Sequence, residues 1–220
     1  MDLSHRFEVC DPIDAPAADD SPRRTGGGLL RATDIAVAVI GLVVSAPILM
    51  LLVLAIRLDS PGAAVFAQVR LGRNRVPFTL YKFRTMVVDA EASTGQVWAT
   101  RNDPRITRIG RFLRKSRLDE LPQLINVLKG EMSMIGPRPI RKKFADQLAA
   151  LDPAYDRRFA VRPGLTGYAQ IYAPYGSNVD EQLQKIPFDR RYADTPLSLR
   201  EYVSLLLRTL WHCTVKPAGR

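Results

Sequence analysis

The longest uncharged stretch of the chain is "IAVAVIGLVVSAPILMLLVLAI", which runs for 22 residues from Ile35 to Ile56. As a helix rising about 1.5 Å per residue it would be roughly 33 Å long, comparable with the ~30 Å hydrocarbon core of a bilayer. The stretch begins well inside the chain and Asp34 flanks it, unlike the apolar core of a cleaved signal peptide. The pattern therefore predicts a membrane-embedded helix over residues 29–58.

Pro47 lies near the middle of this helix, where a proline removes a backbone donor and kinks or breaks the helix. Basic residues flank both ends of the apolar stretch: Arg23, Arg24, Arg31, Arg57, Arg70, Arg73 and Arg75. Since basic flanks favour the cytoplasmic side, the helix is expected to be re-entrant, broken near Pro47, with both ends in the cytosol. A kinked helix that spans the bilayer is the alternative.

The segments on either side of this helix differ in pattern. Residues 1–28 are rich in Asp, Ala, Pro and Gly and poor in large apolar groups, which predicts a disordered cytosolic tail. After the helix, β-forming residues alternate with polar ones around "GRNR", which predicts a β-hairpin carrying Arg70, Lys82 and Arg84. Residues 59–220 are expected to form one cytosolic domain.

A first amphipathic helix is predicted from helical spacing downstream of the hairpin. Its apolar stripe consists of Ile106, Ile109 and Leu113, and its basic face of Arg108, Arg111 and Lys115. Such a helix can lie on an anionic membrane surface, although an ordinary solvated basic face gives the same pattern.

A second helix follows at "SRLDELPQLINVLKG", with an apolar stripe of Leu121, Leu124, Ile125 and Leu128. Pro122 fits only the first turn and Gly130 is placed to end the helix. Asp119 and Glu120 are thus expected at the helix N-terminus. Farther along, Ser198 and Glu201 form a capping box before a last apolar helix, expected to pack on the core or at the interface.

These elements predict an α+β fold that is predominantly helical. Its parts are an N-terminal re-entrant membrane helix, a short β-hairpin, and basic interfacial amphipathic helices around a small cytosolic domain.

Charge and composition narrow the chemistry. The formal net charge is +10, and beyond Asp34 the chain carries 28 basic and 15 acidic side chains, a net +13 that should attract anions. Two histidines and two cysteines, widely separated, argue against a zinc site and imidazole catalysis. A metal would be a hard cation on carboxylate oxygens, such as Mg²⁺.

Asp119 and Glu120 have two interpretations. At a helix start, acidic residues are ordinary caps, each contributing about 1 kcal/mol or less. However, Arg114 precedes them, "GPRP" holds Arg138 between two prolines, and "RPGLTG" presents Arg162 on another turn. Carboxylates, a metal and arginine forks are what phosphoryl transfer requires, and without histidine an Asp carboxylate is the plausible nucleophile.

Three longer stretches carry a family resemblance: "SPGAAVFAQVRLGRN…PFTLYKFRTM", "DPRITRIGRFLRKSRLDELPQLINVLKGEMSMIGPRP" and "RPGLTGYAQ". Over roughly residues 29–210 the chain resembles the bacterial sugar transferases, the monotopic polyprenol-phosphate phosphoglycosyl transferases, in their minimal short form. The resemblance implies a bacterial inner-membrane enzyme whose catalytic domain occupies residues 59–220 on the cytoplasmic face and starts exopolysaccharide or other surface glycan assembly.

The resemblance also implies roles for residues. Asp119 matches the family's nucleophile, which takes the sugar phosphate from a UDP-sugar, releases UMP and passes the group to undecaprenyl phosphate. Glu120 matches the Mg²⁺ ligand, Arg114 and Arg138 match phosphate-associated positions, and Lys82 and Arg162 lie in other basic signatures. The family's membrane helix breaks at Ser-Pro, whereas here Ala46 precedes Pro47 and Ser45 lies one residue earlier.

Expected partners are therefore a UDP-sugar, undecaprenyl phosphate and inner-membrane lipids, with a homodimer left open. A membrane-tethered nucleic-acid-binding protein is a rival suggested by the high isoelectric point. The sequence shows no helix-turn-helix or zinc motif and no aromatics clustered with its arginines, so nucleic acid is not expected as a partner. A lipid-diphosphate phosphatase is the second rival, because it could share the arginine clamp.

Overall fold

The structure, a computed structural model, describes residues 28–92, 94–98, 103–173 and 178–214. The tail predicted over residues 1–28 lies outside this part of the chain, except for Gly28. The longer helices are α1 (Gly28–Asp59), α2 (Arg108–Ser116), α3 (Gln123–Lys129), α4 (Lys142–Leu151), α7 (Ile186–Asp194) and α8 (Leu199–Thr214). Short helices are η2 (Arg73–Arg75), η3 (Leu118–Glu120), η4 (Pro153–Ala160), α5 (Tyr168–Tyr172) and α6 (Val179–Leu183). The strands are β1 (Val65–Leu71), β2 (Pro77–Phe83), β3 (Ser133–Ile135) and β4 (Gly164–Thr166).

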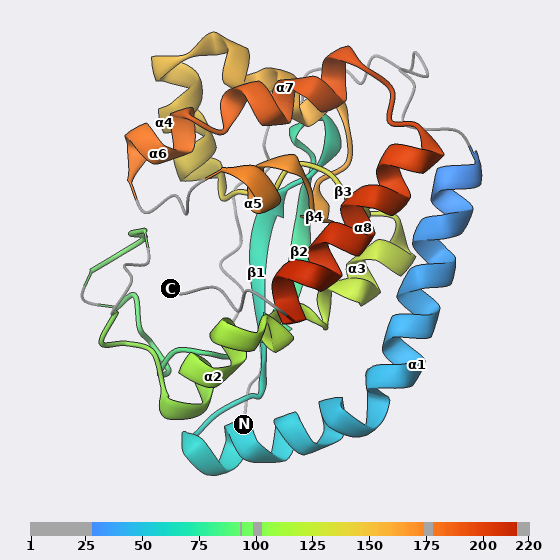
Figure 1. The fold of residues 1–220 in the computed structure, drawn as a ribbon. Helices are drawn as coiled ribbons and strands as arrows, with labels where there is room; N and C mark the ends of the chain where they lie inside the picture. Colours follow the sequence, from blue (N-terminus) through green and yellow to red (C-terminus); the bar gives the residue numbers. More distant parts are fainter. Residues whose placement is uncertain (1–27, 93, 99–102, 174–177, 215–220) are drawn as a thin grey trace.

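Helix α1 contains Pro47 and changes direction sharply part-way along, so that its two halves follow different sides of the molecule (Figure 1). A proline cannot donate to the carbonyl four residues earlier, which makes Pro47 the physical cause of such a bend. The Ser45 hydroxyl donates to the carbonyl of Gly41 at 2.6 Å, a bond that also favours bending. Ser45 thus bonds one turn back within the helix, although Ala46 occupies the position next to the proline.

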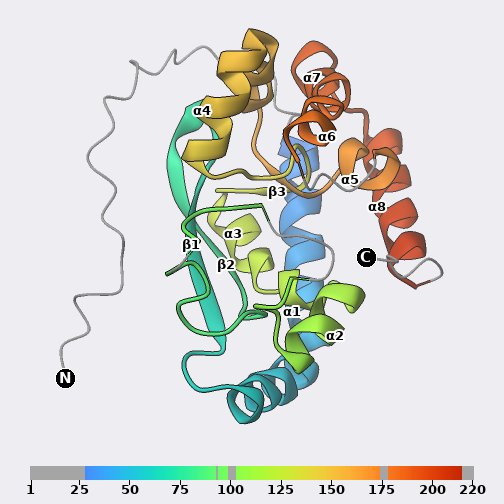
Figure 2. The same ribbon diagram turned by 90° about the vertical axis from the view of Figure 1, so that its left-hand side faces the viewer.

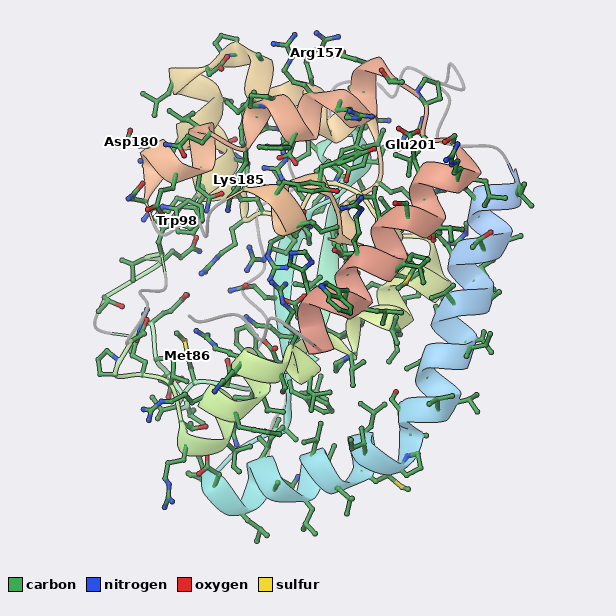
Figure 3. All side chains as sticks on the ribbon, viewed as in Figure 1. Met86, Trp98, Arg157, Asp180, Lys185 and Glu201 are labelled. Carbon is green, nitrogen blue, oxygen red and sulfur yellow. The ribbon has the colours of Figure 1, made fainter. Side chains whose placement is uncertain are left out.

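The outer side of α1 is apolar and uncovered. Its 18-residue window of highest hydropathy has a mean value of 2.9, and only 11 % of that window is buried, so α1 is long and apolar enough to cross a membrane. Large exposed side chains occur on both halves: Val39, Ile40, Val43, Val44, Met50, Leu51, Leu54 and Leu58. Figure 3 shows carbon-only side chains projecting outward along both halves. This is the surface expected of a membrane-embedded helix.

The hairpin predicted around "GRNR" is confirmed. Strands β1 and β2 pair antiparallel with Val65 opposite Phe83 and Leu71 opposite Pro77, and η2 makes the turn. In Figure 2 this hairpin and α8 lie on opposite sides of α1 and α3. Asn126 of α3 joins the hairpin to α3. Its side-chain oxygen accepts from the Tyr81 N–H at 3.1 Å, and its side-chain nitrogen donates to the Thr79 carbonyl at 2.7 Å.

Helix α2 has the amphipathic character that the sequence predicts, although Ile106 lies before its first turn. The Thr107 hydroxyl caps the helix by accepting from the N–H of Gly110 at 2.9 Å. A Cβ on Gly110 would lie 2.1 Å from the carbonyl oxygen of Thr85, so only glycine allows α2 to approach this backbone so closely. Leu113 is fully buried and Phe112 is exposed.

Helix α3 ends at Gly130 in the left-handed conformation (φ 85°), as predicted. Its beginning differs from prediction, because Pro122 caps it from outside and the first helical residue is Gln123. Asp119 and Glu120 instead form the 3₁₀ turn η3, which follows Arg117 at a left-handed φ of 58°. The two carboxylates therefore lie in a short 3₁₀ turn between α2 and α3 rather than in the first turn of α3.

Strands β3 and β4 form a second, parallel pair that the sequence pattern does not predict. The largest buried cluster lies around them and includes Val127, Met132, Met134, Tyr202 and Leu205. The second half of α1 packs in a separate cluster, in which Leu52 and Ile56 meet Phe83 and Leu113. The fold is thus α+β and mostly helical, with a long apolar helix attached along the domain.

Candidate active site

The site is built around the turn η3. Both carboxylates are buried, since Asp119 and Glu120 are each 9 % exposed. Two local features hold them in place: the left-handed residue Arg117 ends α2, and Pro122 starts the next helix. The turn is closed by the N–H of Glu120 bonding the carbonyl of Arg117 at 3.2 Å. A short, stiff connection thus fixes two adjacent carboxylates in one place.

Burial and the neighbouring charge of Glu120 raise the pKa of Asp119 to about 6. The positive charges of Lys82, Arg138 and Arg114 act in the opposite direction. Asp119 is therefore ionised at neutral pH, yet its carboxylate is less stabilised than one in water. A carboxylate in this state is a better nucleophile than a solvated one.

Arg138 binds the second carboxylate with both arms of its guanidinium. Its Nη2 donates to Glu120 Oε1 at 2.5 Å, and its Nη1 donates to Oε2 at 3.3 Å. The buried Arg158 in turn donates to the backbone carbonyl of Arg138 at 2.5 Å and pairs with Asp189 at 3.2 Å. The backbone of Arg138, which lies between two prolines, is thus held in place by the buried ion pair of Arg158 and Asp189.

Two further cations face the carboxylates from α2 and β2. Arg114 Nε donates to Thr85 Oγ1 at 2.8 Å, a bond made possible by the close approach of α2 to the Thr85 backbone at Gly110. Lys82 is half-buried beside the Phe66 ring, with its nitrogen 5.2 Å from the ring centre. Burial and the charges of Arg70 and Arg114 lower the pKa of Lys82 to about 7.

Arg70 completes this group from β1. Burial and the charges of Arg138 and Arg141 lower its pKa to about 9, and it donates to the carbonyl of Pro139 at 3.4 Å. Four cations from separate elements, Arg70, Lys82, Arg114 and Arg138, thus meet two carboxylates. Figure 3 shows nitrogen-tipped side chains gathered over the middle of the hairpin in this view. The arrangement favours a polyanionic ligand.

Arg162 lies in a different group. Its pKa is lowered by burial and by the charges of Arg31 and Arg73, and raised by Asp34. It lines a cavity of about 70 Å³ together with Arg31, Asp34, Ser133, Tyr202 and neighbouring residues. The structure thus brings Asp119, Glu120, Arg114, Arg138 and Lys82 together and places Arg162 beside the first half of α1, where its predicted role in substrate binding stays a prediction.

Asp119 and Glu120 offer carboxylate oxygens, the donors that a hard cation prefers. Among the described residues no group of three or more His, Cys, Asp or Glu side chains could hold an ion by itself. Mg²⁺, however, is commonly bound by one or two carboxylates together with substrate phosphates and water. Asp119 and Glu120 fit that mode, in which the ion would compete with Arg138 for Glu120.

Sequence reasoning missed the residues that support the site. Arg70 was noted only as a charge on the hairpin, whereas Thr85 and Arg158 gave no signal. Thr85 contacts Arg114, which lies 29 residues away in the sequence, and Arg158 contacts the backbone carbonyl of Arg138. Neither contact produces a pattern in the sequence from which it could be predicted.

A comparison with protein-family models identifies residues 27–216 as a match to the bacterial sugar transferase model. The match covers the membrane helix, the hairpin and the whole of the site. The chain belongs to the bacterial sugar transferase family.

Curated relatives of this sugar transferase support the assignment. It is 43% identical over 162 residues to a UDP-N-acetylgalactosamine-undecaprenyl-phosphate N-acetylgalactosaminephosphotransferase of Aeromonas hydrophila, covering 74% of this chain and 38% of the relative. Two UDP-glucose:undecaprenyl-phosphate glucose-1-phosphate transferases are also similar. The Caulobacter vibrioides protein is 40% identical over 210 residues, covering 90% of this chain and 78% of its own. The Escherichia coli protein is 39% identical over 193 residues, covering 86% and 41%. The chain thus spans less than half the length of the Aeromonas and Escherichia relatives.

Proposed function

We propose that this sugar transferase moves a sugar 1-phosphate from a UDP-sugar to undecaprenyl phosphate, as a first step of exopolysaccharide or other surface glycan assembly. One observation supports the proposal: a buried carboxylate, Asp119, lies close to a group of four cations from separate parts of the chain. The printed activities of the relatives supply the substrate classes.

In the first step the Asp119 carboxylate attacks the β-phosphorus of the UDP-sugar. The bond between that phosphorus and the bridging oxygen breaks, and UMP leaves with the bond's electron pair. The sugar phosphate remains on Asp119 as an acyl phosphate. In the second step an oxygen of undecaprenyl phosphate attacks the same phosphorus and displaces the carboxylate, which forms the diphosphate-linked lipid sugar and restores Asp119.

The cations bind and neutralise the phosphates during both steps. Arg114, held by Thr85, and Arg138, held by Arg158, present preorganised forks, whereas Lys82 and Arg70 add charge from the hairpin. Such preorganised donors stabilise charge that develops on phosphoryl oxygens at no further cost in reorganisation.

A magnesium ion, held by Glu120 together with the substrate phosphates, would supply additional neutralisation of phosphate charge when bound. Release of Glu120 would then leave the Arg138 guanidinium available to a phosphate oxygen.

The bend in α1 supports a re-entrant arrangement in the membrane. With apolar side chains on the outside of both halves and basic flanks at both ends, α1 enters the bilayer and returns to the same side. The exposed Phe112 and the basic residues of α2 then meet the interface. This topology places the catalytic domain on the cytoplasmic face of the inner membrane, where both substrates are expected.

The direct test is a UMP-release assay with undecaprenyl phosphate across a panel of UDP-sugars, using Asp119→Asn as the matched inactive control. We expect UMP release with at least one sugar nucleotide and none in the control. Release of inorganic phosphate in place of UMP would instead support a lipid-diphosphate phosphatase. Salt-dependent DNA binding without turnover would support a nucleic-acid-binding protein.

A further inference from the structure

Asp34 is a buried carboxylate in the first half of the membrane helix, only 3 % exposed. Its Oδ1 accepts three hydrogen bonds from the domain: from the Met134 N–H at 2.8 Å, the Ser133 hydroxyl at 3.0 Å and the Tyr202 hydroxyl at 2.5 Å. A charge this deeply buried is costly unless its bonds are satisfied, so this carboxylate ties α1 firmly to β3 and α8.

Arg31, one turn earlier, makes a second polar attachment. Its guanidinium donates to the carbonyls of Val127 and Leu128, at 2.8 and 3.1 Å, near the C-terminal end of α3. Helix C-termini favour cations at this position. The apolar helix thus joins α3, β3 and α8 through hydrogen bonds, which are directional and fix a register that apolar packing alone would not.

Strand β3 continues directly into the site. Met134, which bonds Asp34, precedes Arg138 by four residues, and the backbone from Ser133 to Pro137 is fixed at several points. Ser133 N–H bonds Pro163 O at 2.9 Å, Gly136 N–H bonds Thr166 O at 2.9 Å, and Gly164 N–H bonds Pro137 O at 2.8 Å. Arg138 then binds Glu120. A short, braced segment therefore connects the membrane helix to the catalytic carboxylates.

We propose that Asp34 is a positioning residue that sets the height of Asp119 relative to the lipid headgroups. The proposal rests on the proposed function, because it concerns how the lipid acceptor reaches the intermediate. The two substrates differ in this respect: a UDP-sugar arrives from water, whereas the phosphate of a long-chain lipid is confined to the headgroup layer. A loosened attachment should therefore slow the acceptor step more than the donor step.

The test separates the two steps in enzyme reconstituted into phosphatidylcholine and phosphatidylglycerol nanodiscs. The donor step is the UMP burst without acceptor, and the acceptor step is the decay of the preformed intermediate on adding undecaprenyl phosphate. Asp34→Val removes all three bonds yet keeps the helix apolar. Thr33→Val is the matched control, because among the described residues the Thr33 hydroxyl bonds within its own helix, to Leu29 O at 2.9 Å.

For Asp34→Val we expect the acceptor step to slow about tenfold or more, with the donor step changed less than about twofold. Asp34→Asn keeps an acceptor oxygen in the same place, so we expect the rates of both steps in this variant to stay within about threefold of the wild-type rates. A water-soluble short-chain isoprenyl phosphate should restore the acceptor step in Asp34→Val, since such an acceptor needs no fixed depth. The control should match wild type throughout.

Equal losses in both steps, or no loss in either, would overturn the proposal. If Asp34→Val does not fold, Tyr202→Phe removes one donor and should slow only the acceptor step, by about threefold. Unchanged or equally slowed steps in that variant would then overturn the proposal. Failure of the proposed function itself would look different, because the wild-type protein would then release no UMP with any sugar nucleotide.

Discussion

Asp119 combines two properties that usually conflict, burial and ionisation. The sequence alone favours a helix cap for such a residue, and only the arginines around it suggest chemistry. The structure brings Arg114, Arg138 and Lys82 beside this carboxylate, leaves Arg162 in a separate group, and shows why the carboxylate is unusual: burial and the charge of Glu120 raise its pKa to about 6. The raised pKa of Asp119 should affect both the stability of the protein and the pH dependence of its activity.

The first consequence is a stability cost. The folded-state pKa of Asp119 lies above the ordinary value of 3.8 for an Asp carboxyl group, so ionisation opposes folding. The cost is absent below about pH 4 and complete above about pH 6, where the difference in pKa corresponds to about 3 kcal/mol. Asp119→Asn should therefore unfold at a higher denaturant concentration than wild type at pH 7.5 in EDTA, and at a similar one at pH 4. A less stable Asn variant at pH 7.5 would contradict this account.

The second consequence is a narrow pH optimum. The donor-step kcat/KM should rise through about pH 6 as Asp119 ionises and fall above about pH 7 as Lys82 loses its charge. Lys82→Arg keeps a positive charge at high pH and should extend the alkaline side of the profile. An alkaline limb that does not move in this variant would show that another group titrates there.

Arg138→Lys should reduce kcat/KM by about tenfold or more, because a lysine cannot replace the two-armed contact with Glu120 or a phosphate. Thermal unfolding of the variant serves as the control, since the side chain is nearly half exposed and its loss should cost little stability. A kcat/KM close to that of the wild type would show that Arg138 has a structural role only.

At the scale of elements, prediction succeeded where the pattern was long or chemically distinctive. The apolar stretch, the hairpin at "GRNR", the end of α3 at Gly130 and the capping box of Ser198 and Glu201 are all present. Strands β3 and β4 were not predicted, because three residues are too few to show an alternating pattern. The position of Arg162 was not predictable either, since it depends on how α1 docks against β3 and β4.

The topology of α1 can be tested by cysteine labelling in a variant without Cys10 and Cys213. Leu29 is 64 % exposed at the start of α1, so Leu29→Cys should react with an impermeant thiol reagent only from the cytoplasmic side. A cysteine at residue 59, beyond the other end of the apolar stretch, should behave in the same way. Labelling at residue 29 only from the periplasm would show that α1 spans the bilayer.

At the scale of the whole molecule, a basic domain, a bent apolar helix and a buried carboxylate are parts of one arrangement. The net charge of +13 beyond Asp34 favours anionic ligands, and α1 is long and apolar enough to hold the domain at a membrane. The polar attachment at Asp34 then connects the anchor to the site through β3. In the proposed function, the phosphosugar passes through Asp119.

The covalent step on Asp119 can be tested directly. The wild-type enzyme is incubated with its UDP-sugar and no acceptor, and the released UMP and the mass of the peptide containing Asp119 are then measured. We predict a burst of about one UMP per enzyme and a phosphosugar adduct on Asp119 that undecaprenyl phosphate removes. UMP release that begins only when the acceptor is added, with no adduct on Asp119, would contradict the account.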